Sequence, residues 1–408
     1  MNFEILNVNE KAVFDTSISY AEKRTHQPYA STSFNLNDEI RLPIEHQDVY
    51  TLPWLSSLYI EGKVIATNDK HETIISPNVK FANNGIMLMF DEVRYEIAGN
   101  VVDRVRNPGL ASIMKGYATY NTNESIALQN AGWFPKSPST IIDQDSGYFN
   151  VVIPLRLILG LCEDFRKIIL NVRQELVLVR SNTDLNALVV NDETVHNVKI
   201  NISKIFWKMP HITVSDAERL RLIDTLSKNR ELDVPFRSRE LHEYPLLPQT
   251  QRHTWSIKTS IEKPQYIFFG LQTDRKNQLS KDYSQFDHCN LRNVKVYLND
   301  EMYPYDNLNL NFNNNSFAAL YEMFIEFQAS FLDKVGEPIF TPEEFKTIAP
   351  IVVVDCTKQS EMLKRSPVSI RLEFETRTNI PGKTTAHCLI LHDRVAKYIP
   401  AQGVIRVV

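Results

Sequence analysis

Residues 289–331 constrain the fold more than any other stretch, and they read CNLRNVKVYLNDEMYPYDNLNLNFNNNSFAALYEMFIEFQASF. Apolar side chains alternate with charged or aromatic ones at Val294, Val296 and Leu298. A period of two is typical of a strand that buries one face. Asn299 and Asp300 then supply turn chemistry, and residues 303–310 are expected to form a second extended piece.

A helix is expected directly after these two extended pieces. The polar run at residues 313–316 offers several N-cap candidates for it. Large side chains then recur at helical spacing: Phe317, Leu320, Tyr321, Phe324, Phe327 and Phe331. A stripe this broad must lie against other structure to escape water. We therefore expect the helix to pack on the neighbouring sheet, with Phe324 buried in the contact.

The same arrangement occurs about 200 residues earlier in the chain. There, apolar residues alternate with charged ones over residues 93–97, and Gly99 and Asn100 supply a turn. A shorter helical stripe follows at Leu110, Ile113, Met114 and Tyr117. Two further pairs of segments match in the same order: residues 168–172 with 368–372, and 198–202 with 386–390. Similar order with drifting offsets predicts two diverged copies of one domain, with insertions confined to loops.

Length and composition agree with two soluble globular domains. The chain has 408 residues, which is more than one core usually supports. Hydrophobic residues make up 43% and charged residues 23%, so neither disorder nor a membrane class is indicated. The net charge of −4 argues against a dedicated nucleic-acid binder, because phosphate recognition needs a concentrated positive surface. No specific nucleic-acid site is evident.

The cysteines and the N-terminus indicate the compartment. Cys162, Cys289, Cys356 and Cys388 are scattered and form no CxxC pair, so buried free thiols and a reducing compartment are expected. The first fifteen residues, MNFEILNVNEKAVFD, lack the apolar core of a secretion signal. No segment approaches eighteen uninterrupted apolar residues, so no membrane span is expected.

Taken in order, the chain divides into an arm and two domains. Residues 1–29 are expected to form an extended N-terminal arm, of the kind that a neighbouring subunit often orders. Residues 30–212 contain short strand-like runs and one short helix after Pro154, which favours a sandwich or barrel. Residues 213–408 begin with a linker helix, for which Ser215 and Glu218 have capping-box spacing. Later, Thr341 is expected to cap another short helix.

The spacing of the histidines argues against a metal site. His46, Gln47 and Asp48 form an HxD triplet, which can ligate iron in jelly-roll oxygenases when a distant histidine completes the set. A chance triplet at a strand edge is the better interpretation, because no later histidine stands in a suitable context. His387 and His392 are an odd number of residues apart on one expected strand. They should point to opposite faces and cannot easily share a metal.

Two further clusters carry chemistry in principle. Asp287, His288 and Cys289 could suggest a nucleophile with its base, but adjacent residues on an extended chain diverge. Tyr303, Pro304 and Tyr305 could stack on a ligand, although packing in a loop or against another subunit is the preferred interpretation. We therefore predict no catalytic, cofactor-binding or metal-binding residue, no cofactor and no enzymatic activity.

Several long motifs resemble a known family. They are PHITVSDAERLRL at residues 210–222, HEYPLLPQTQRHTW at 242–255, FGLQTDRKNQLSKDYSQFDHCNLRNVKVYLND at 269–300, YPYDNLNLNF at 303–312 and RLEFETRTNIP at 371–381. These stretches resemble the double jelly-roll proteins of arthropod genomes. Those proteins are similar to the major capsid proteins of Polinton or Maverick elements and adintoviruses, in the adenovirus and PRD1 capsid lineage.

The resemblance implies an all-β fold of two tandem antiparallel jelly rolls, with short helices in the loops. It further implies a structural protein whose chains form homotrimeric, pseudo-hexagonal capsomers of a viral or virus-like shell. The expected partners are other copies of the chain, together with a minor capsid or penton protein. The expected location is the virion, after synthesis in the cytoplasm or nucleus. A jelly-roll enzyme and a domesticated interaction or carbohydrate-binding module remain as the alternatives.

Overall fold

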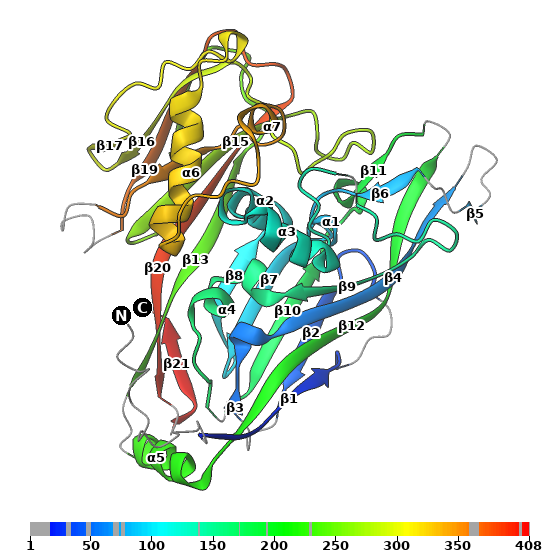
Figure 1. Ribbon diagram of the computed structural model, residues 1–408, viewed down its shortest axis with the longest axis vertical. Coiled ribbons are helices and arrows are strands. Elements are labelled where there is room, and N and C mark those ends of the chain that lie inside the picture. Colours follow the sequence, from blue (N-terminus) through cyan, green and yellow to red (C-terminus); the bar gives the residue numbers. More distant parts are fainter. Residues whose placement is uncertain are drawn as a thin grey trace, which may run out of the picture.

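The chain folds into two tandem halves of antiparallel strands, which Figure 1 shows in blue to green and in green to red. The computed structural model describes residues 17–29, 34–45, 50–67, 73–74, 78–137, 139–170, 172–192, 195–227, 231–358, 367–399 and 402–407. Strands from residues 18–214 build the first half, which we call the first jelly roll. Strands from residues 232–407 build the second jelly roll.

The first jelly roll is a sandwich of two main sheets. One sheet places β1, β12, β4 and β9 side by side, and the shorter strands β3 and β5 pair with β12 and β4. The other sheet has the order β2–β10–β7–β8. The bounds are β1 (Ile18–His26), β2 (Glu39–Ile44), β3 (Tyr50–Thr51), β4 (Ser57–Thr67), β5 (Thr73–Ile74), β7 (Phe90–Ile97), β8 (Asn100–Arg106), β9 (Tyr148–Pro154), β10 (Gln174–Arg180) and β12 (His196–Val214). A small separate sheet pairs β6 (Val79–Phe81) with β11 (Leu188–Val190).

The second jelly roll repeats this plan. One sheet has the order β13–β20–β15–β18, with β21 also paired to β20, and the other has the order β14–β19–β16–β17. The bounds are β13 (Leu232–Tyr244), β14 (Arg252–Ile257), β15 (Pro264–Thr273), β16 (Leu291–Leu298), β17 (Glu301–Tyr303), β18 (Val352–Asp355), β19 (Ile370–Thr376), β20 (Thr384–Ile399) and β21 (Val404–Val407). The aromatic run at residues 266–272 is an inner strand, β15, as its composition indicates.

The two halves have the same topology. When the main strands of each half are numbered one to eight in chain order, both give sheets 1–8–3–6 and 2–7–4–5. This order is the double Greek key of a jelly roll. The predicted fold class, all-β with two tandem antiparallel jelly rolls, is therefore confirmed.

Helices occupy the connections between strands. The α-helices are α1 (Gly85–Leu88), α2 (Pro108–Thr119), α3 (Thr122–Leu128), α4 (Gly160–Asp164), α5 (Asp216–Ser227), α6 (Ala318–Leu332) and α7 (Pro342–Ile348). Short 3-10 helices are η2 (Pro53–Leu55), η3 (Gln129–Ala131), η4 (Leu155–Leu157), η5 (Leu185–Ala187) and η6 (Phe312–Asn314). α2 and α6 lie in equivalent connections, between the fifth and sixth strands of their jelly rolls, and Figure 1 shows them near one another.

The aromatic helix packs as the sequence predicts, although its cap differs. Phe324, Phe327 and Phe331 are buried on α6, and the Phe327 ring lies 5.0 Å from the ring of Phe268 on β15. The prediction that residues 313–316 cap this helix is wrong. These residues lie in or directly after η6, which Asn311 caps, so Phe317 stands at the N-cap of α6 without a side-chain bond. Thr341 does cap α7, in a capping box with Glu344.

Two expected extended segments are not strands. The second extended piece expected over residues 303–310 belongs to a strand only at Tyr303, where β17 ends. The Lys295 ammonium binds the carbonyls of the next three residues and holds them in a loop. Residues 168–172 are not the counterpart of 368–372, because β10 begins only at Gln174. The ladders give the true equivalence, since Leu178 faces Val93 in the first jelly roll as Phe374 faces Val294 in the second. The other two matched pairs lie on equivalent strands, β7 with β16 and β12 with β20.

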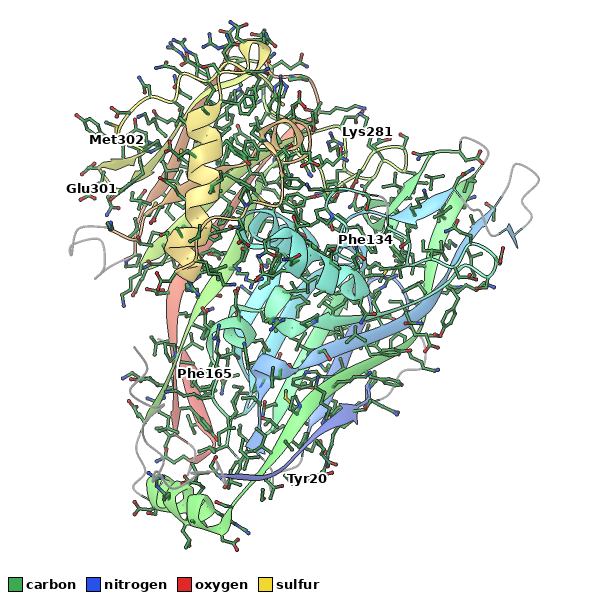
Figure 2. The ribbon with its side chains drawn as sticks, in the orientation of Figure 1. Tyr20, Phe134, Phe165, Lys281, Glu301 and Met302 are labelled. Carbon is green, nitrogen blue, oxygen red and sulfur yellow. The ribbon has the colours of Figure 1, made fainter. Side chains whose placement is uncertain are left out.

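Strands at both ends of the first jelly roll extend beyond residues 30–212. Residues 18–26 of the expected arm form β1, which pairs along β12 and supplies the first of the eight main strands. β1 is exposed along most of its length, so its sequence carries no buried stripe; Figure 2 shows Tyr20 on it. The linker helix exists as α5, and the Ser215 hydroxyl accepts the backbone N–H of Glu218. As domain limits, residues 1–29, 30–212 and 213–408 stay a proposal.

The expected helix after Pro154 is two short pieces. η4 and α4 are separated by Ile158 and Leu159, and the φ of −103° and ψ of 131° at Leu159 are extended. After this break, α4 lies against β13 of the second jelly roll.

Candidate functional site

The histidine candidates do not converge on one site. His46 and Asp48 lie outside the described residues. His387 and His392 lie on β20 and line two different cavities, as expected for side chains on opposite faces. Within the part of the chain that the structure describes, no group of three or more His, Cys, Asp or Glu side chains could hold a metal ion.

Asp287, His288 and Cys289 each have a structural role. The Asp287 carboxylate accepts two bonds from the Arg275 guanidinium, at 3.0 and 2.6 Å. The His288 ring stacks on Phe312, with 4.5 Å between centroids. Burial raises the pKa of Cys289 to about 11, so its thiol stays protonated near neutral pH. The three neighbours therefore do not form a nucleophile with its base.

The remaining candidates are also structural. All four cysteines are free and buried, as predicted. Burial raises the pKa of Cys162, Cys356 and Cys388 as well, which is the environment of inert rather than reactive thiols. Tyr305 lies in the loop held by Lys295, and its side chain is 80% exposed. That ring is available for contact with another molecule.

An unusual group of charges is instead buried where the two jelly rolls meet. α4 of the first jelly roll contacts β13 of the second, and α2 lies beside both β13 and α6 (Figure 1). We call the charged residues at this place the junction cluster: Lys115, Glu163, Asp164, Arg237 and Arg239. Its carboxylates come from the first jelly roll and its guanidiniums from the second.

Glu163 joins cations from both jelly rolls. Its carboxylate accepts a bond from Lys115 Nζ at 2.6 Å and another from Arg239 Nη2 at 2.7 Å. The side chains of Lys115 and Arg239 are only 3% and 1% exposed. Burial would raise the pKa of Glu163, but Lys115 and Arg239 outweigh it and lower the pKa to about 2. Glu163 is therefore an anion at every physiological pH.

Asp164 makes a second bridge one residue later. The Arg237 guanidinium donates to both carboxylate oxygens of Asp164, from Nε at 2.9 Å and from Nη2 at 2.6 Å. The same carboxylate accepts the backbone N–H of Arg237 at 2.8 Å. The guanidinium carbon of Arg237 lies 3.6 Å from the centroid of the Phe331 ring, and Lys115 Nζ lies 4.4 Å from it. Thus α6 covers the two cations with an aromatic face.

The backbones of α4 and β13 also approach each other closely at the junction. A Cβ at Gly160 would lie 1.8 Å from the carbonyl oxygen of Arg237, so only glycine permits α4 to approach β13 this closely. The buried carboxylate of Asp103 accepts the backbone N–H of Leu161 and the hydroxyl of Ser238, both at 2.9 Å. Burial raises the pKa of Asp103. The contact therefore combines main-chain, ionic and aromatic interactions across one boundary.

This arrangement fixes the relation of the two jelly rolls rather than performing chemistry. Removing one partner of a buried ion pair leaves an uncompensated charge, which is strongly destabilising. Sequence reasoning missed the cluster because charged residues are normally exposed. The available signal was the pair of adjacent carboxylates, Glu163 and Asp164, directly after an apolar run.

The strand edges of the two jelly rolls differ in what covers them. β8 contacts β13 and β21 of the second jelly roll. Its counterpart β17 lies at an outer edge, where Figure 2 shows Glu301 and Met302 away from the first jelly roll. β1, the counterpart of β13, is likewise exposed, with Ile18 and Tyr20 49% and 57% exposed. Exposed strand edges invite pairing or packing with another chain.

None of the helices in the described residues is long and apolar enough to cross a membrane.

Comparison with known proteins gives one family and several structural neighbours. A family model described as double jelly roll-like domain matches residues 79–396. A chain in the 3.5 Å cryo-EM structure of the Sputnik virophage is 12% identical, with a TM-score of 0.63 over 99% of this chain and 91% of that chain. The mavirus major capsid protein is 10% identical, with a TM-score of 0.58 over 98% of this chain and 92% of that chain. The Faustovirus major capsid protein is 9% identical, with a TM-score of 0.61 over 97% of this chain and 92% of that chain. No curated protein matches the chain by sequence.

Proposed function

This chain belongs to the double jelly roll-like domain family, and from that premise we infer that it is a structural, capsid-like protein without enzymatic activity. The observation that carries the proposal is the doubled fold itself. Two jelly rolls of identical strand order are held in one fixed relation by the junction cluster. A rigid pair of similar blocks is suited to tiling a surface, because each chain supplies two equivalent positions. The likeness to the mavirus and Faustovirus major capsid proteins, and to a chain of the Sputnik virophage, supports this role.

The proposed assembly is a homotrimer with threefold symmetry. Three chains supply six similar blocks, which close into a pseudo-hexagonal capsomer without leaving an open end. Within one chain, β8 faces β13 and β21. In the trimer, the equivalent contact brings β17 of one chain against β1 of the next, because β17 is the counterpart of β8 and β1 that of β13. Every jelly roll then has the same neighbour on the same side.

The surfaces that this contact would join are partly apolar. β1 exposes Ile18 and Tyr20, and β17 exposes Met302 at 37%. Tyr305 extends the second surface from the loop after β17. Covering these side chains gains apolar burial that the isolated chain does not have.

We also propose how the capsomers assemble further and where the protein originates. Capsomers would associate more weakly into a shell, in which a minor capsid or penton protein fills other positions. The protein would be synthesised inside the cell and reside in the virion or virus-like particle. A viral, transposon-borne or endogenous source, of the Polinton or Maverick and adintovirus kind, accounts for the resemblance of its motifs.

Light scattering coupled to size exclusion tests the trimer directly. The purified chain at micromolar concentration should elute with three times the chain mass of 47.1 kDa, and negative-stain images should show threefold particles. A mass of one chain across a range of salt concentrations contradicts the capsomer. A monomer that binds glycans in the same preparation would instead support the interaction-module alternative.

A further inference from the structure

A cavity of about 340 Å³ lies between the jelly rolls, next to the junction cluster. Its walls come from β8 of the first jelly roll and from β13, β20 and β21 of the second. Four guanidiniums and two imidazoles line it: Arg104, Arg106, Arg239, Arg394, His242 and His392. The hydroxyls of Ser238 and Ser260 are also part of the lining.

The positive charge of this cavity is only partly compensated. Arg239 is bound to Glu163 at 2.7 Å, and Arg106 lies 3.4 Å from Glu92. Among the described residues, Arg104 and Arg394 have no carboxylate oxygen within 4.0 Å. In the β7–β8 ladder, Arg104 lies directly opposite another cation, Arg94. Arg94 is itself bound by the carboxylates of Glu39, Glu92 and Glu96, so Arg104 gains no anionic partner across the ladder and can accept one from solution.

The carboxylates in the lining do not remove this excess. Glu240 and Glu262 also face the cavity, which leaves four guanidiniums against two carboxylates. Glu240 is already engaged, because its Oε2 accepts the Thr259 hydroxyl at 3.0 Å and lies 3.7 Å from His242 Nε2. The nearby Asp103 carboxylate is occupied by the Leu161 amide and the Ser238 hydroxyl. Arg104 and Arg394 therefore supply free donor capacity.

We propose that this cavity binds a phosphate-class oxyanion. Guanidinium groups bind phosphate oxygens through paired N–H donors, and the hydroxyl of Ser260 adds a neutral donor. The volume of about 340 Å³ accommodates a short polyphosphate with its water. Because Arg104 belongs to the first jelly roll and Arg394 to the second, a bound anion tightens the junction. This site is independent of any assembly of the chain.

The first experiment measures binding by the full-length chain. Sodium tripolyphosphate is titrated calorimetrically into the protein at constant ionic strength, which sodium chloride maintains. We expect one site per chain with a Kd below about 1 mM and a matching rise in Tm. No heat of binding and no rise in Tm relative to chloride would overturn the proposal.

Variants locate the site. The double variant Arg104→Gln, Arg394→Gln should weaken tripolyphosphate binding at least about tenfold. The control, Arg252→Gln with Arg371→Gln on β14 and β19, removes the same charge outside the cavity and should bind like the natural chain. Equal weakening in both double variants would reduce the effect to net charge and refute the site. If the first variant does not fold by circular dichroism, Arg104→Gln alone is used, because Arg104 is exposed.

A last experiment distinguishes a small phosphate anion from a nucleic-acid backbone as the ligand. A short single-stranded DNA oligomer carries the same groups but cannot fold its chain into the cavity. We expect tripolyphosphate binding to depend on Arg104 and Arg394 while any DNA binding does not. DNA binding that is as tight as tripolyphosphate binding and equally sensitive to the double variant would replace the small anion by a nucleic-acid backbone and overturn the proposal.

Discussion

The two jelly rolls share one topology but differ in where their neighbour lies. In the first, the fifth strand, β8, has seven residues and is covered by β13 and β21 of the second jelly roll. In the second, the equivalent β17 has three residues and lies at an outer edge. The first jelly roll thus finds its neighbour inside the chain. In the part of the chain that the structure describes, the second jelly roll has no such neighbour, so the outer edge at β17 is an unfilled contact.

The equivalent helices show the same difference. All twelve residues of α2 are buried, including Lys115. α6 buries one stripe, while Glu322 and Glu326 are exposed. α2 is therefore an interior helix and α6 a peripheral one. A Cβ at Gly116 would lie 2.4 Å from the Trp133 ring, so close packing demands small residues on α2 that the aromatic stripe of α6 does not need.

The largest expected effect is at the junction cluster. Replacing Glu163 by Ala leaves Lys115 and Arg239 buried without their carboxylate, and should cost roughly 3–5 kcal/mol of unfolding free energy. Urea unfolding measures this loss. The control is Glu326→Ala on the exposed side of α6, which should change the unfolding free energy by less than about 0.5 kcal/mol. A loss below about 1 kcal/mol for Glu163→Ala would mean that the charges do not hold the jelly rolls together.

The aromatic stripe should give the next largest effect. Phe324 is 1% exposed, and its ring lies 4.8 Å from that of Phe345 on α7. Phe324→Ala should cost about 3 kcal/mol, the low end of the usual range, because α6 can shift inward from its open side. The same urea measurement applies. An unchanged fold with a lost trimer would reassign the stripe to the subunit interface.

The two regions should respond to acid in different pH windows. Burial lowers the pKa of His387 to about 4, against 6.5 in the unfolded chain, so the unfolded state takes up the proton first as pH falls. Stability should therefore fall by at most about 3 kcal/mol between pH 6.5 and 4, and His387→Gln should flatten this slope. The carboxylate of Glu163, with a pKa of about 2, loses its stabilising effect only between pH 4.5 and 2. Denaturant unfolding at half-unit pH steps distinguishes the windows; an unaltered slope in His387→Gln would contradict the first.

Substitutions on the outer strands β1 and β17 should have the smallest effect on the stability of the chain. Met302→Asp on β17 and Tyr20→Asp on β1 change exposed positions, so each should alter stability by less than about 0.5 kcal/mol. Both should nevertheless shift the light-scattering mass from three chains towards one, because each places a charge in the proposed contact. Thr254→Asp on the far edge strand β14 is the control and should leave the mass unchanged. Trimers that survive both changes would place the contact elsewhere.

The sequence predicts the parts of the fold that depend on local periodicity. Val294, Val296 and Leu298 lie on one buried face of β16, and Thr341 caps α7, because alternation and capping act within a few residues. The extended piece expected over residues 303–310 was predicted too long, because the end of β17 depends on Lys295. This residue is nine positions from the first carbonyl that it binds. The sequence did not predict the junction cluster, because its partners, such as Glu163 and Arg239, meet only in the tertiary fold.

That long-range pairing sets an order of events during synthesis. Arg239 follows Glu163 by 76 residues, so at roughly 5–20 residues per second it is made roughly 4–15 s later. By then β12 has been translated, and the strands of the first jelly roll can already be paired while α4 presents two carboxylates without their arginines. The nascent first jelly roll thus presents a charged docking face beside Gly160, and the arrival of β13 completes the contact.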